Sequence, residues 1–118
     1  MDEDEVKRRT RAWMESQGYK VREEIGVNGT ERQVILDFYG YREEKGEPQI
    51  VWVECKGDQN LSELLEGWIR LEFGLFYGGG KGIFAVPKHS AERLVKHEEL
   101  LKGCPIKILN VESYQLNL

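Results

Sequence analysis

Apolar positions at the start of the chain recur with helical spacing. Residues 2–17 are predicted to form a helix, whose apolar face carries Val6, Thr10, Trp13 and Met14. Gly18 follows as a stop signal.

The pattern then changes to the alternation of β-strands. Three strands are predicted, over residues 19–27, 30–41 and 49–56. The dipeptide Asn28-Gly29 predicts a type I′ turn between the first two, because both central residues of that turn need a positive φ. The polar residues 42–48 predict a second hairpin loop.

Helices and strands alternate in the second half of the chain. Asn60 followed by Glu63 predicts the capped start of a long helix that the glycines 78–80 end. A strand over residues 83–86, a helix from Ser90 to Leu101 and a last strand over residues 106–109 follow. The order α-β-β-β-α-β-α-β predicts an α/β domain over residues 1–118, with a mixed sheet and helices on its faces.

Composition and charge narrow the class of protein. The 118 residues are 40% hydrophobic and 32% charged, which fits one globular domain. The net charge of −4 excludes a globally basic nucleic-acid coat. We expect no membrane partner, because no apolar stretch approaches the ~18 residues of a membrane span. Two cysteines, Cys55 and Cys104, favour neither a disulfide framework nor a zinc site, and a cytoplasmic location is expected.

Three charged residues lie in otherwise apolar strands. Glu54 and Lys56 are two apart and therefore project from one face, and Asp37 lies opposite them if the second and third strands pair. Such charges are costly unless they are paired or bind a metal. They suit metal-assisted phosphodiester hydrolysis, in which Asp37, Glu54 and the Cys55 backbone carbonyl bind Mg²⁺ and Lys56 orients a water. A structural ion pair at a strand end is the alternative.

The segments ILDFYG and IVWVECKGD resemble the PD-(D/E)XK nuclease superfamily, which has a restriction-endonuclease-like fold of three layers. ESQGYKV after the first helix is most similar to the small Holliday-junction-resolving nucleases. The resemblance implies a Mg²⁺-dependent DNA endonuclease, with Mn²⁺ as a substitute, that acts on branched DNA. It implies Asp37 and Glu54 as metal ligands and Lys56 as the catalytic lysine, although Leu36 stands where the family name has proline. Glu3, Asp4 and Glu5 are candidates for the first-helix glutamate of the family, and Glu5 is the choice.

Basic and polar residues outside this motif are candidates for nucleic-acid contact: Lys7, Arg8 and Arg11 on the first helix, Gln59, and Lys88. Their alternatives are a solvated helix face and plain loop residues. Phe73, Phe76 and Tyr77 are compatible with a homodimer surface and equally with core. Two other functions stay open: a non-catalytic nucleic-acid-binding or regulatory module, and an RNA-directed nuclease.

Overall fold

The computed structural model describes residues 1–97, 99, 103 and 105–117. Its elements are, in chain order, α1 (Glu3–Ser16), β1 (Lys20–Asn28), β2 (Gln33–Glu44), β3 (Glu47–Cys55), α2 (Leu61–Gly78), β4 (Lys81–Val86), α3 (Lys88–Val95), β5 (Ile106–Asn110) and β6 (Gln115–Asn117). The strands form one six-stranded sheet in sequence order. The β3–β4 and β4–β5 pairs are parallel and the others antiparallel. The predicted α/β class and mixed sheet are therefore confirmed.

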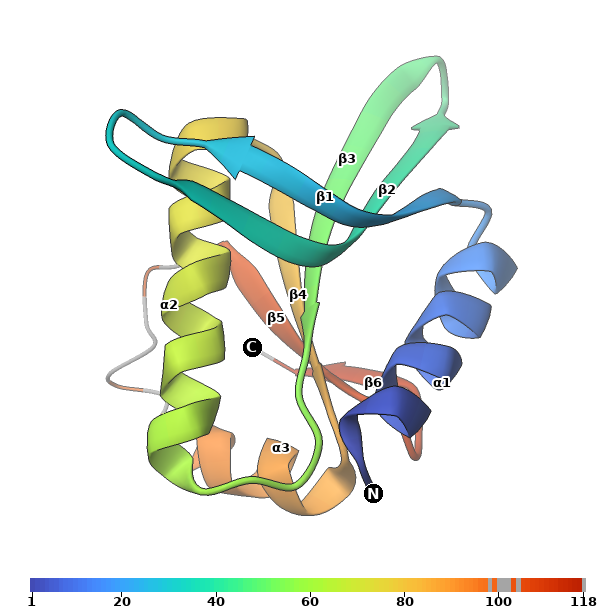
Figure 1. Ribbon diagram of the computed structural model, residues 1–118. Helices are drawn as coiled ribbons and strands as arrows, with labels where there is room; N and C mark the ends of the chain where they lie inside the picture. The colour runs from blue at the N-terminus through green and yellow to red at the C-terminus, as the bar shows by residue number, and fades with distance from the viewer. Residues whose placement is uncertain (98, 100–102, 104, 118) are drawn as a thin grey trace.

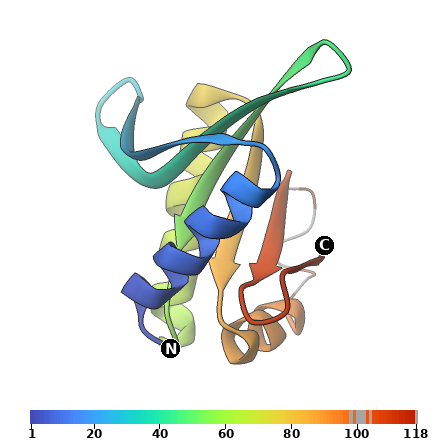
Figure 2. The same ribbon diagram turned by 90° about the vertical axis from the view of Figure 1, so that its right-hand side faces the viewer.

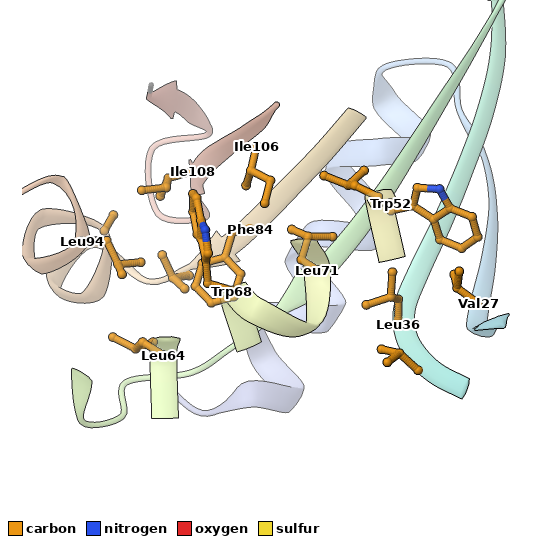
Figure 3. Packing of buried hydrophobic residues seen from close by; sticks show 14 residues of the cluster. Val27, Leu36, Trp52, Leu64, Trp68, Leu71, Phe84, Leu94, Ile106 and Ile108 are labelled. Atoms are coloured by element: carbon orange, nitrogen blue, oxygen red, sulfur yellow. The ribbon is translucent and has the colours of Figure 1, made fainter. Parts of the chain in front are cut away.

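The two long helices cover opposite faces of the sheet (Figure 1). Figure 2 shows α1 in front of the sheet and α2 behind it. One core cluster joins Val6 and Met14 of α1 to the sheet residues Val53 and Cys55. The other packs α2 against the opposite face, with Trp68 as its largest fully buried side chain (Figure 3). Residues of α1 and α2 are thereby fixed against the same central strands.

The start of α2 follows the sequence prediction. The Asn60 carboxamide oxygen accepts a 2.9 Å hydrogen bond from the Glu63 backbone N–H, and its Nδ2 donates a 2.8 Å bond to Glu63 Oε1. This capping interaction supplies an acceptor to a helix N–H that lacks an intrahelical partner. The helix ends before Gly79, whose φ is 69°, so the predicted glycine stop is also confirmed.

The prediction of a type I′ turn at Asn28-Gly29 is wrong. Neither residue has a positive φ, and residues 29–32 form a longer loop. Gly29 packs closely against α2, because a Cβ on it would lie 2.5 Å from the Phe73 ring. The two-residue turn with positive φ is at Lys45 (54°) and Gly46 (80°), so β2 and β3 extend into the predicted loop 42–48.

In the last third of the chain one prediction is wrong and one strand was not predicted. Ser90 does not cap a helix, because α3 begins at Lys88 and the buried Ser90 hydroxyl donates a 3.0 Å hydrogen bond to Asp58. The predicted end of this helix at Leu101 lies outside the described residues. The short strand β6 was not predicted, since Leu116 is its only apolar residue and gives no alternation to detect.

Candidate active site

Asp37 and Glu54 come together through the pairing of β2 with β3. The register pairs Phe38 of β2 with Val53 of β3. Asp37 precedes Phe38 and Glu54 follows Val53, so the two acids lie next to each other on one face of the antiparallel pair. The Asp37 carboxyl group forms a hydrogen bond with Glu54. Its Oδ2 also accepts a 2.7 Å hydrogen bond from the Cys55 backbone N–H. The main chain of β3 therefore fixes the carboxylate of β2.

Glu54 is a buried acid, with only 2% of its surface exposed. Arg70 Nη1 lies 3.2 Å from Glu54 Oε2. Burial raises the pKa of Glu54 to about 9, helped by the hydrogen bond and charge of Asp37, while the charges of Arg70 and Lys56 oppose the shift. At neutral pH the Glu54 carboxyl group therefore keeps its proton.

Two lysines approach the carboxyl pair from different elements. Lys56 directly follows the last residue of β3, and its Nζ lies 3.8 Å from Glu3 Oε1. Its stem crosses α2 at Gly67, where a Cβ would lie 2.9 Å from Lys56 Cε. Lys7 of α1 places its Nζ 3.4 Å from Asp37 Oδ1 and 3.4 Å from Glu3 Oε2. Thus the structure brings together the predicted residues Asp37, Glu54, Lys56 and Lys7.

Glu3, and not the chosen Glu5, is the first-helix glutamate of this cluster. Glu3 contacts both lysines, whereas Glu5 is bound to Arg8 and, at 2.8 Å, to Arg9. Those hydrogen bonds lower the pKa of Glu5 to about 2. The signal for Glu3 was its i,i+4 spacing from Lys7, which places the two on one face of the helix.

The other basic residues of the first helix form ion pairs with acidic residues outside the carboxyl pair. Arg8 contacts Glu5, and Arg11 contacts Glu15 and Glu23 of β1. The contact of Arg8 and Arg11 with nucleic acid stays a prediction. Acidic residues within reach on α1 and β1 supply their partners.

Gln59 and Lys88 have other surroundings. The Gln59 backbone carbonyl accepts a 2.8 Å hydrogen bond from Arg93, and its buried Oε1 has no hydrogen-bond partner in the described part of the chain. The Lys88 backbone N–H donates to Glu112 Oε2 at 2.6 Å, and its side chain is exposed. Their contact with nucleic acid stays a prediction.

Arg70 was missed by the sequence reasoning. It is the only basic residue of α2, and its neighbours in the sequence, Ile69 and Leu71, are apolar. That isolation was the available signal, since a single cation in the middle of an apolar helix often has an acidic partner in the fold. Its partner, Glu54, could not be named without knowing that α2 packs on this face of β3.

The oxygen donors of the pair fit a hard divalent cation. Asp37 and Glu54 offer two adjacent carboxyl groups, and Mg²⁺ commonly binds through one or two carboxylates while it keeps several waters. Within residues 1–97, 99, 103 and 105–117, no group of three or more His, Cys, Asp and Glu side chains is placed to hold a metal ion. A bound metal would therefore depend on these two carboxylates, with water and main-chain oxygens completing its shell.

Comparison with protein-family models, with curated proteins and with solved structures finds no match. None of the helices in the described residues is long and apolar enough to cross a membrane.

Proposed function

We propose that this protein is a Mg²⁺-dependent nuclease that hydrolyses phosphodiester bonds of DNA. The observation that carries the proposal is the buried Glu54 carboxyl group beside Asp37, with Lys56 next in line on the same face. An acid pair with one strongly raised pKa costs stability, and such pairs cluster at functional sites. The restriction-endonuclease-like assignment of the fold belongs to the same proposal. It is supported by a mixed sheet between two helices and by acids where β2 meets the end of β3.

Each residue has a role in the proposed reaction. Asp37 and Glu54 would hold the metal, and the Cys55 backbone carbonyl is a further candidate ligand. The metal would polarise the phosphate and make its bound water more acidic. Lys56, whose stem is held against Gly67, is suited to orient the attacking water and to stabilise negative charge on the phosphate.

A cleavage assay tests the proposal directly. Linear, supercoiled and four-way-junction DNA are incubated with the protein and Mg²⁺, Mn²⁺ or EDTA. We expect cleavage with either metal and none with EDTA, and the junction arm tests the resemblance to junction-resolving nucleases. Cleavage of RNA alone would support the RNA-directed alternative. Binding without cleavage on every substrate would support the non-catalytic module.

The proposal extends to a homodimer, because cutting both strands of a duplex needs two sites. The outer side of α2 exposes Phe76 (82%), Ile69 (64%) and Tyr77 (40%), an apolar surface that a second copy could cover. Sedimentation equilibrium of the wild type and of Phe76→Glu tests this, with a monomer expected for the variant. A cytoplasmic location remains the expectation from the cysteine content.

A further inference from the structure

Lys7 contacts the Asp37 carboxylate oxygen that does not accept a hydrogen bond from the main chain. Oδ2 is held by the Cys55 N–H at 2.7 Å, and Oδ1 lies 3.4 Å from Lys7 Nζ. A lysine side chain is a charged ammonium at neutral pH, and this one lies between the carboxylates of Asp37 and Glu3.

An ammonium and a divalent cation compete for one carboxylate oxygen. One oxygen of the second carboxyl group is also in contact with a cation, because Glu54 Oε2 lies 3.2 Å from Arg70 Nη1. Two cations within a few ångströms of each other repel strongly in a partly buried site. A metal that binds this pair must therefore move the ammonium away from Asp37.

The Lys7 side chain can make that movement without a change in the backbone. Its stem is flexible, as in any lysine, and 33% of the side chain is exposed. Glu3, one helical turn earlier, already lies 3.4 Å from Lys7 Nζ and would retain the ammonium after it leaves Asp37. The displaced ammonium would then lie beside the site, with an N–H donor available for another acceptor.

We propose that Lys7 is the internal counter-ion of the carboxyl pair in the metal-free protein, that Mg²⁺ displaces its ammonium from Asp37 towards Glu3, and that the displaced ammonium then contacts a phosphate of the substrate. This inference rests on the proposed function. It requires Lys7 to oppose the binding of one ligand and to favour the binding of the other, which a purely structural ion pair would not do.

The test measures the binding of Mg²⁺ to the full-length, metal-free protein by calorimetry. Lys7→Gln removes the competing charge, and we expect it to bind Mg²⁺ about tenfold more tightly than the wild type. Lys7→Arg keeps the charge and the carboxylate contacts, so its affinity should equal or fall below that of the wild type. Lys20→Gln is the matched control, because it removes an exposed lysine at the start of β1 and should leave Mg²⁺ affinity unchanged. Circular dichroism melting confirms that each variant is folded.

A second measurement addresses the phosphate contact. Binding of a duplex DNA oligonucleotide is followed by fluorescence anisotropy with Ca²⁺ in place of Mg²⁺, so that binding is read without relying on cleavage. Lys7→Gln should bind the DNA several-fold more weakly than the wild type, and Lys7→Arg should bind it as well as the wild type does.

The outcomes separate this inference from the proposed function. If the wild type binds Mg²⁺ and Lys7→Gln binds it equally or less tightly, the counter-ion role is wrong and the nuclease proposal stands. If Lys7→Gln and Lys7→Arg both bind Mg²⁺ more tightly, the charge of Lys7 is not the cause and the inference is overturned. If neither the wild type nor Lys7→Gln binds Mg²⁺, both proposals fail. Unchanged DNA affinity in Lys7→Gln removes the phosphate contact.

Discussion

The backbone N–H of Cys55 donates a hydrogen bond to Asp37 Oδ2, so the strand that carries Glu54 also orients its neighbour. One carboxyl group of the pair is thereby fixed by main chain, and the other is held by a side chain, Arg70. Substitution of Asp37 and of Glu54 should therefore have different consequences for the fold.

Asp37→Asn should leave the protein folded but reduce Mg²⁺ binding and cleavage. The amide oxygen can still accept from the Cys55 N–H, so we expect a change in unfolding free energy of no more than about 1 kcal/mol. A metal-binding charge is lost, so Mg²⁺ affinity and cleavage should each fall at least ~10-fold. Metal-free DNA binding should hold or tighten, because a negative charge near the phosphate is removed. Thermal melting, calorimetry and cleavage on one preparation check this, and a large drop in melting temperature with retained specific activity would favour a structural ion pair.

The raised pKa of Glu54 makes stability depend on pH. The folded protein keeps this proton up to a pKa of about 9, whereas the unfolded chain releases it near the ordinary value of 4.5. The Glu54 contribution is therefore full below pH 4.5 and is lost as pH rises towards 9, by at most about 1.4 kcal/mol per pH unit. Glu54→Gln should flatten this slope and be the more stable protein at pH 8. Urea unfolding at pH 5, 7 and 9 measures it, and parallel slopes for the two proteins would contradict the shift.

The same proton should be linked to the metal. A carboxyl group that ligates Mg²⁺ must be ionised, so binding at pH 7 should release up to one proton from Glu54. Mg²⁺ affinity should rise between pH 6 and pH 9, by at most ~10-fold per pH unit. Calorimetry in two buffers of different ionisation enthalpy counts the proton. A binding enthalpy that is independent of buffer would place the metal elsewhere.

Gly67→Ala should displace the Lys56 side chain while leaving the protein folded. The added Cβ would lie 2.9 Å from Lys56 Cε and 3.0 Å from the buried Phe84 ring. Overpacking costs ~1–3 kcal/mol, which the higher helix propensity of alanine offsets by ~1 kcal/mol. The displaced ammonium should lower cleavage about tenfold.

Gly74→Ala is the control from the same helix. Its Cβ would lie 2.5 Å from the Leu36 side chain, which is a core residue rather than part of the site. We expect lower stability with unchanged specific activity in the folded fraction. Full specific activity in Gly67→Ala would show that the position of Lys56 does not matter.

The sequence predicted the three central residues of the site because strand alternation and hairpin pairing are local rules. Asp37, Glu54 and Lys56 needed only a period of two and an antiparallel register to be placed together. Their roles in metal binding and catalysis stay predictions. The turn was misplaced for a different reason. A glycine is needed at position 29 because the backbone packs closely against Phe73. This tertiary requirement produces the same Asn-Gly dipeptide that a tight turn would.

Residues contributed by helices were harder to predict. Arg70 reaches Glu54 across 16 positions of sequence, and only the packing of α2 on the sheet determines which strand residue it meets. On the first helix, the choice between Glu3 and Glu5 depended on which side of the Val6–Met14 stripe faces the ends of the central strands. Periodicity defines such a stripe but does not orient it along the sheet.

The contacts of Glu3 with Lys7 and Lys56 make the first turn of α1 part of the site, although helix ends fray more readily than helix centres. Fraying of that turn would separate Glu3 from Lys56 while the sheet and α2 remain intact. Hydrogen exchange at residues 3–7 should therefore follow the loss of function on warming more closely than exchange in β3 and β4 does. The proposed activity would then be lost through local opening, well below the temperature at which the core unfolds.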